Sequence, residues 1–120
     1  MARTPSNMLA LGTKATDFSL PNTVDSKTYS FDKISGTRGT VVMFICNHCP
    51  YVIHVMESII ALAKDYQNNG VGFVAISSND VVNYPDDDPA LMKETAKKYG
   101  FSFPYLYDES QDVAKAYDAA

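Results

Sequence analysis

The sequence is poor in several features that other functional classes require. It has two cysteines, two histidines and no tryptophan in 120 residues, and lysine and arginine are scattered through a chain of formal charge −4. Scattered basic residues do not form the basic face with which proteins bind the nucleic-acid backbone, so we expect no nucleic-acid partner. Two cysteines are too few for a disulfide scaffold, and a domain of this length can bury a sufficient core without one.

Long apolar runs are also missing. The first eighteen residues, MARTPSNMLALGTKATDF, contain one early arginine but no apolar stretch long enough for a signal peptide or a membrane span. We therefore expect no membrane partner and a cytoplasmic location, where a structural disulfide is unusual. With 46% hydrophobic and 20% charged residues, the composition is typical of a globular protein. We expect one domain over residues 1–120.

Two apolar runs on either side of a helical pattern predict the centre of the fold. Residues 40–45, TVVMFI, and 71–76, VGFVAI, are rich in β-branched residues and predict strands buried on both faces. Between them, apolar residues recur at helical spacing up to Gly70, which suits the end of a helix. Strand, helix and strand joined by short connections predict a right-handed βαβ unit. The periodic apolar positions are Val52, Val55, Met56, Ile59, Ile60, Ala63 and Tyr66.

The preceding segment predicts a hairpin after an arm. Residues 1–14 show little periodicity, whereas residues 17–21 and 28–31 alternate apolar and polar side chains around a stretch rich in turn formers.

The segment after the βαβ unit predicts two further helices and a strand. Asp88 suits an N-cap and Pro89 the first position of a helix that ends at Tyr99. Residues 103–107 predict a short strand, and residues 111–120 predict a last helix. Its candidate caps are Asp108, Glu109 and Ser110.

The two cysteines form a C-x-x-C motif at the predicted strand-to-helix junction. Cys46 and Cys49 enclose His48, and Pro50 follows in the first helical turn. The unpaired N–H groups and partial positive charge of a helix N-terminus stabilise a thiolate, so we predict a lowered pKa for Cys46. A protonated His48 adds a second positive charge. Cys49 lies about one turn further on and is predicted to be more buried, which suits a resolving thiol in disulfide exchange.

Other uses of the cysteine pair are less well supported. Apart from carboxylates, the whole chain offers four zinc ligands, Cys46, Cys49, His48 and His54, and His54 falls on the polar face of the helix. We therefore expect no metal and no cofactor. A c-type haem needs a histidine after Cys49, where Pro50 stands. Two inert cysteines stay an open alternative, because free cysteine is commonly buried.

No acid beside the cysteine pair is evident as a proton acceptor. The strand at 40–45 contains none, and Glu57 falls on the polar side of the helix. The segment PDDDP at 85–89 offers three carboxylates to a hard cation, but we interpret it as an acidic, helix-capping loop.

Three segments together resemble the thioredoxin-like redoxins. They are KATDFSLPN (14–22), FICNHCPYVIHV (44–55) and FPYLYDESQDVAKAYDAA (103–120). More closely, they resemble the thioredoxin-fold proteins related to alkyl hydroperoxide reductase and thiol-specific antioxidant proteins, which often carry C-N-H-C-P. The resemblance runs from about Leu11 to the last residue.

This resemblance implies a fold, an activity and partners. The fold is a three-layer α/β/α thioredoxin fold with a mixed central sheet and an N-terminal hairpin extension. The activity is thiol–disulfide oxidoreduction, with Cys46 attacking, Cys49 resolving and His48 in the site. The partners are a protein or small-molecule disulfide and a thiol or thioredoxin-type electron donor.

The resemblance also has departures. The family's cis-proline loop, closing strands and final helix do not occur in these 120 residues, so the sequence looks like the front portion of a longer domain. We expect an open sheet edge that favours a homodimer. The peroxiredoxin pattern P-x-x-x-T-x-x-C aligns Cys49 with the peroxidatic cysteine, but Val42 and Cys46 replace the proline and threonine. A thiol peroxidase and a non-enzymatic binding module are thus the alternatives.

Overall fold

The two apolar runs of the sequence form neighbouring parallel strands. β3 (Gly39–Phe44) pairs with β4 (Val71–Ser77), with Gly39 opposite Val71. β5 (Tyr105–Tyr107) pairs in parallel with the other side of β4, so the strand order is β3-β4-β5. The structure is a computed structural model that describes residues 9–119. It confirms the predicted strand–helix–strand unit.

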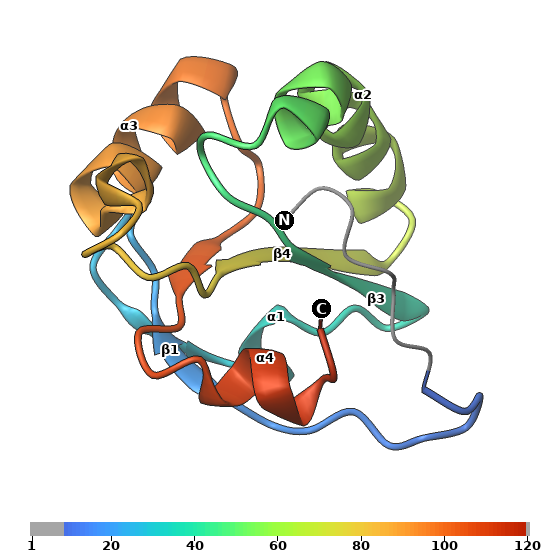
Figure 1. Cartoon of the computed structure of the whole chain (residues 1–120). Helices are drawn as coiled ribbons and strands as arrows, with labels where there is room; N and C mark the ends of the chain where they lie inside the picture. Colours follow the sequence, from blue (N-terminus) through green and yellow to red (C-terminus); the bar gives the residue numbers. More distant parts are fainter. Residues whose placement is uncertain (1–8, 120) are drawn as a thin grey trace.

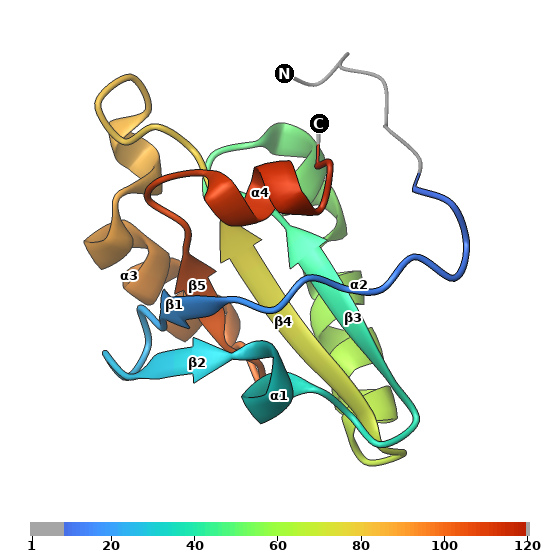
Figure 2. The ribbon, with the colours of Figure 1, turned by 90° about the horizontal axis from the view of Figure 1, so that it is seen from below.

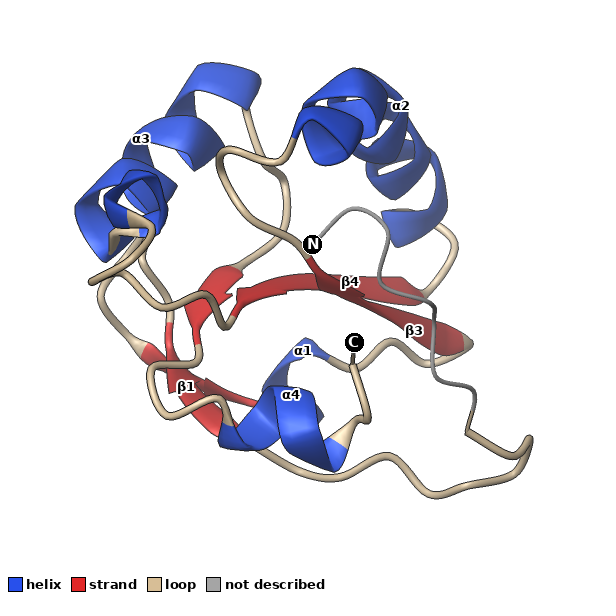
Figure 3. Ribbon diagram, in the orientation of Figure 1, coloured by secondary structure: helices blue, strands red, loops and turns tan. Residues whose placement is uncertain are grey.

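Helices cover both faces of this sheet (Figures 1 and 3). α2 (Pro50–Gln67) and α3 (Pro89–Tyr99) lie on one face. α1 (Phe31–Ile34) and α4 (Asp112–Ala116) lie on the other. The result is the layered α/β architecture that the sequence predicts. No helix in the described part of the chain combines the length and apolar character that crossing a bilayer requires.

The predicted hairpin is present and lies beside β5 (Figure 2). β1 (Ser19–Pro21) and β2 (Thr28–Ser30) pair antiparallel, and one antiparallel bridge joins Asn22 to Leu106. The predicted arm at 1–14 falls partly outside the described residues, and its described part, 9–14, contains no helix or strand.

The central strand β4 separates two apolar clusters, one on each face of the sheet. Alternate β4 residues point to opposite faces, so Val74 and Ile76 join one cluster and Phe73 and Ala75 join the other. Burying each large apolar side chain stabilises the fold by about 1.5–3 kcal/mol. The first cluster contains Phe18, Leu20, Ile34, Val74, Ile76, Leu106 and Val113, and the second contains Ala63, Phe73, Ala75, Met92, Ala96, Phe103 and Tyr105.

β3 is less buried than the sequence predicts. The last five residues of β4 are buried, whereas no residue of β3 is, and Val41 is exposed. β3 lies at the edge of the sheet among residues 9–119, so one side of the strand lacks a neighbour. Its open edge agrees with the expected one, and pairing of two chains through it stays a prediction.

Local sequence signals predicted the start of α2 and both ends of α3. Pro50 is the first residue of α2, and the α3 bounds match the predicted ones, with the Asp88 carboxylate accepting a hydrogen bond from Ala90 N at 2.8 Å. Gly100 ends α3 in the left-handed conformation, with φ 68°. The last helix, α4, is shorter than predicted, and the buried Asp108 accepts from Ala114 N at 3.0 Å near its start.

A glycine contact between β4 and the segment before β3 gives the first prediction. A Cβ at Gly72 would lie 2.2 Å from Ile34 O and 2.7 Å from Gly36 N, both backbone atoms that cannot rotate away. Gly72→Ala should therefore lower the free energy of unfolding by about 1–3 kcal/mol or more, as overpacking does. Urea unfolding followed by circular dichroism measures this change. Gly39→Ala is the matched control, because a Cβ there meets no atom within 4 Å. Equal stability of the two variants would contradict the prediction.

Candidate active site

Both cysteines lie in the short loop that joins β3 to α2. β3 ends at Phe44, and Cys46 follows two residues later, at the strand-to-helix junction. The amide of Ile45 still donates to Ile76 O of β4 at 3.0 Å, so the chain before Cys46 is held against the sheet. Cys49 is the N-cap residue of α2.

The order of burial of the two thiols is opposite to the predicted one. Cys46 is 6% exposed, whereas Cys49 is only partly buried, and both are free thiols. The prediction that Cys49 is the more buried cysteine is wrong. The helix begins after Cys49 and not before it, so Cys49 occupies the accessible end of α2 and Cys46 the interior side of the loop.

The prediction of a lowered pKa for Cys46 is also wrong. Burial is the largest influence and raises the pKa of the Cys46 thiol, because removal from water disfavours the thiolate. Backbone N–H groups of Cys49 and His48 act in the opposite direction, and the negative charge of Asp87 raises the pKa further. The net result is a thiol that stays protonated above the pH at which an ordinary cysteine ionises.

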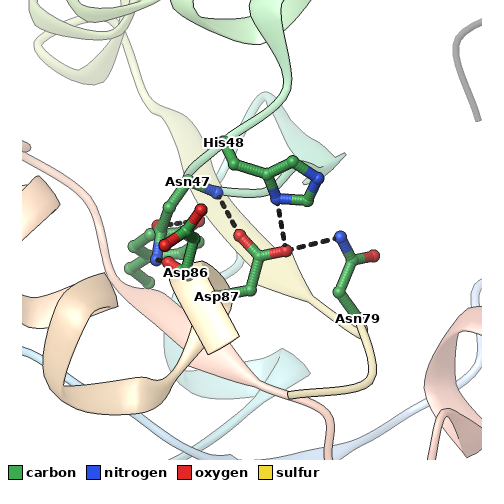
Figure 4. Close-up of polar contacts among 6 residues, drawn as sticks. Asn47, His48, Asn79, Asp86 and Asp87 are labelled. Carbon is green, nitrogen blue, oxygen red and sulfur yellow. Dashed lines mark hydrogen bonds and ion pairs between the residues drawn. The ribbon is translucent and has the colours of Figure 1, made fainter. Parts of the chain in front are cut away.

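A buried carboxylate, Asp87, lies at the centre of the site (Figure 4). Its Oδ1 accepts a hydrogen bond from Asn47 N at 2.8 Å, and its Oδ2 accepts one from Asn79 Nδ2 at 2.7 Å. Oδ2 also lies 2.7 Å from Nδ1 of His48, an ion pair when the ring is protonated. The expectation that no buried acid adjoins the cysteine pair is therefore wrong.

His48 is held between Asp87 and an aromatic ring. Its ring stacks on Tyr84 with centroids 5.3 Å apart and an interplanar angle of 8°. Its side chain is 28% exposed, and its second nitrogen faces away from Asp87 in Figure 4. The ring thus has one nitrogen directed at a buried anion and one available to incoming molecules, which suits a group that takes up and releases protons.

Asn47 ties this loop to β5 and to the acidic segment. Its side-chain oxygen accepts a hydrogen bond from Tyr105 Oη at 2.9 Å, and its Nδ2 donates to Asp86 O at 2.8 Å. Burial raises the pKa of Tyr105 far above its usual range, and the charges of Cys46 and Asp87 add to the effect. Tyr105 is therefore a neutral donor that holds the loop in place.

The acidic segment contains Asp87, the candidate site residue that the sequence did not indicate. The 3-10 helix η1 (Pro85–Asp87) turns Asp87 inward, while Asp88 caps α3 as predicted. Three consecutive aspartates offer no local signal of which one points inward. The presence of an inward-facing acid could have been inferred only from the general rule that βα loops of parallel strands meet at one edge of the sheet.

Of the predicted site residues Cys46, Cys49 and His48, two are grouped with Asp87, and Cys49 follows them as the N-cap of α2. Cys46 and His48 lie close together with Asp87, and one potential ligand atom from each lies within 4.8 Å of the others. Among the residues that the structure describes, these three side chains form the group whose donor atoms suit a metal ion. His54 is exposed on α2, as predicted.

A groove beside His48 gives access to the site. It has a volume of about 520 Å³ and is bounded by the Asn47–His48 loop and by α3. The other lining residues are Leu91, Thr95, the basic Lys98 and the acidic Asp86 and Glu94. The groove therefore exposes His48 to solvent next to α3.

The charge of Asp87 gives a prediction for the pKa of Cys46. In a Cys49→Ser background, Asp87→Asn should lower the pKa of Cys46, because it removes the negative charge while keeping an acceptor for Asn47 N–H. Burial remains, so the pKa stays above the ordinary value. The pH dependence of alkylation by iodoacetamide reports the change. Asp86→Asn is the control, since Asp86 contacts Asn47 through its backbone carbonyl. An unchanged or raised midpoint would refute the assigned role of Asp87.

Comparison with known proteins gives a consistent result. The model of the AhpC/TSA family matches residues 11–120. A crystal structure of an uncharacterized conserved protein from Geobacillus kaustophilus is 52% identical, with a TM-score of 0.94, and the match covers 96% of this chain and 61% of that one. A hypothetical protein from Sinorhizobium meliloti is 39% identical, with a TM-score of 0.89 and coverage of 93% and 61%.

A third structure, with lower sequence identity, has a name that states an activity. A secreted disulfide oxidoreductase from Mycobacterium tuberculosis is 19% identical, with a TM-score of 0.68, and the match covers 84% of this chain and 67% of that one. No curated protein matches. The chain spans about 61% of the length of the two more similar structures. From the family match and these shared folds, the chain belongs to the AhpC/TSA family and has a thioredoxin-like fold.

Proposed function

We propose that this chain carries the dithiol centre of a thiol–disulfide oxidoreductase, formed by Cys46 and Cys49. The observation that carries the proposal is the pairing of a buried thiol with an accessible one in a single C-x-x-C loop at the start of α2. Such a pair can form a mixed disulfide at one sulfur and release it with the other. Membership of the AhpC/TSA family supports redox chemistry at these positions.

The burial of the thiols supports Cys49 as the attacking residue. An incoming disulfide must approach along the S–S axis, and the partly exposed Cys49 permits this where the 6% exposed Cys46 does not. Cys49 is also the N-cap of α2, at the accessible end of the helix. Cys46 then serves as the resolving residue, which reverses the roles expected from the sequence.

The proposed cycle balances atoms and electrons. The Cys49 thiolate attacks a disulfide R–S–S–R′, forms Cys49–S–S–R and expels R′S⁻, which takes up a proton. Cys46 loses its proton and attacks the Cys49 sulfur, forming the Cys46–Cys49 disulfide and expelling RS⁻. The pair gives up two electrons and two protons, and the substrate is reduced to two thiols. A thiol or thioredoxin-type donor restores the dithiol by the reverse exchange.

His48 and Asp87 supply the proton acceptor that the second step needs. Cys46 has a raised pKa, so its proton must pass to a nearby base at the moment of attack. His48 lies in the same cluster, with its Nδ1 2.7 Å from Oδ2 of Asp87. Protein or small-molecule disulfides are the proposed substrates, and the groove beside His48 is the proposed path to the site.

Single cysteine variants test the proposal and the order of attack. Cys46→Ser and Cys49→Ser should each reduce insulin disulfide reduction to background, because the cycle needs both sulfurs. Cys46→Ser should accumulate a mixed disulfide at Cys49, identified by mass spectrometry. His54→Ala, a change of an exposed residue on α2, should retain full turnover.

Two other results of these experiments would change the proposal. Trapping at Cys46 in Cys49→Ser, with none at Cys49 in Cys46→Ser, would restore the order of attack expected from the sequence. Absence of turnover in the wild-type chain with both thiols reduced would favour the binding module.

A thiol peroxidase is the second candidate, because the accessible Cys49 at the helix N-terminus suits peroxide attack as well. In that reaction Cys49–S⁻ takes an oxygen from H₂O₂, giving Cys49–SOH and water after protonation. The Cys46 thiol then condenses with it, giving the disulfide and a second water. The threonine hydroxyl of the peroxiredoxin pattern is replaced by Cys46.

Stoichiometric hydrogen peroxide separates the two candidates. In Cys46→Ala, Cys49 should form sulfenic acid no more than about tenfold faster than a free thiol, because no hydroxyl stands at the position of the peroxiredoxin threonine. Dimedone labelling followed by mass spectrometry gives the rate. Rapid, complete labelling of Cys49 within the mixing time would replace the oxidoreductase with the peroxidase.

A further inference from the structure

We propose that the reduced protein binds a zinc ion through Cys46, His48 and Asp87, and that formation of the Cys46–Cys49 disulfide expels it. The binding half of this inference stands on the geometry of the three side chains. The release half rests on the proposed function, because it requires the disulfide to form.

The ligand set is chemically suited to zinc. A thiolate, an imidazole nitrogen and a carboxylate oxygen are the three donor types that zinc takes in proteins. In this structure their donor atoms lie within 4.8 Å of one another. Zinc ligand distances of about 2.0–2.3 Å bring such atoms to within roughly 4 Å of each other, so small side-chain shifts complete the site. Three protein ligands leave one tetrahedral position for water.

The residues around the ligands already orient them. Asn47 N donates to Oδ1 of Asp87 and Asn79 Nδ2 donates to Oδ2, which fixes the plane of the carboxylate (Figure 4). Stacking on Tyr84 fixes the plane of the His48 ring. Hydrogen bonds and packing of this kind around metal ligands typically control affinity by 10- to 100-fold. The cluster therefore has the support that a metal site needs.

The contact between His48 and Asp87 is a second indication. Nδ1 of His48 is buried and 2.7 Å from the carboxylate, yet it makes no well-directed hydrogen bond. A buried polar atom without a directed partner is uncommon and calls for an explanation. A cation seated between this nitrogen, the carboxylate and the Cys46 sulfur gives the nitrogen a partner.

Burial of the cluster favours binding and still permits access. Asp87 is fully buried and Cys46 nearly so, and a divalent cation offsets the cost of holding a carboxylate and a thiolate together away from water. His48 is 28% exposed and lines the groove next to α3, which provides a path for the ion. Asp87 joins Cys46 and His48 only in the folded chain, so the C-x-x-C motif alone does not predict this ligand set.

The coupling to redox state follows from the shared sulfur. Zinc binding displaces the proton of the Cys46 thiol to solvent and forms a Zn–S bond. A disulfide oxidant that converts the pair to Cys46–S–S–Cys49 takes two electrons, so the Cys46 thiolate is lost and Zn²⁺ leaves with its charge unchanged. Conversely, bound zinc occupies the resolving thiol and should slow the second step of the exchange reaction.

Zinc titration of the fully reduced 120-residue chain, in competition with a chromogenic chelator, tests the binding half. We expect one equivalent of Zn²⁺, with affinity at least about tenfold weaker in Cys46→Ser and in His48→Ala. Cys49→Ser and His54→Ala should bind like the wild type. Substitution by Co²⁺ should give a thiolate charge-transfer band that Cys46→Ser lacks, and circular dichroism confirms that each variant is folded.

Two results of the titration would overturn the site. One is equal affinity of wild type, Cys46→Ser and His48→Ala, which means adventitious zinc. The other is loss of binding in Cys49→Ser, which means that Cys49 is a ligand.

Oxidised wild-type protein, with its disulfide verified by the loss of two hydrogen atoms in the intact mass, tests the release half. It should bind zinc at least about tenfold more weakly than the reduced protein, whereas Cys49→Ser carried through the same treatment, with unchanged mass, should bind normally. Retained affinity in the oxidised protein overturns the release. If the disulfide does not form while the reduced chain binds zinc, the proposed function and the release both fail and the zinc site stands. If the disulfide forms and the reduced chain binds no zinc, only the zinc site fails.

Discussion

The candidate active site depends on the hydrogen bonds and the charge contact of the buried Asp87 carboxylate. A charge removed from water is costly unless donors and a counter-charge surround it. Here the donors are Asn47 N and Asn79 Nδ2, and the counter-charge is His48 when protonated. Because these groups come from the cysteine loop and from the segment after β4, one carboxylate fixes the position of the loop relative to the sheet.

Burial, reinforced by the same charge, distinguishes Cys46 from Cys49. Burial and the negative charge of Asp87 disfavour a thiolate at Cys46. This sulfur therefore stays protonated until a base takes its proton or a metal cation displaces it. Cys49 is farther along the loop, at the accessible N-terminus of α2. In the proposed cycle, Cys49 therefore meets the substrate and Cys46 acts second, and the proposed roles of the neighbouring imidazole are proton transfer and metal binding.

Much of the fold follows from local patterns that the sequence displays openly. The run at 71–76 became the buried strand β4, and Asp88, Pro89 and Gly100 marked the ends of α3, because caps and turns act over one or two residues. The run at 40–45 looks equally apolar, yet β3 is an edge strand. Apolar content alone does not reveal how many neighbours a strand has.

The sequence by itself determined the chemistry that is available: two thiols three residues apart, an imidazole between them, and a strand and a helix to hold them. Only the tertiary structure decided which thiol is buried and which of three adjacent aspartates turns inward. The hydrogen bond that settles the second point joins residues 40 positions apart, Asn47 and Asp87. Such contacts arise where η1 meets the loop after β3, and no local propensity encodes them.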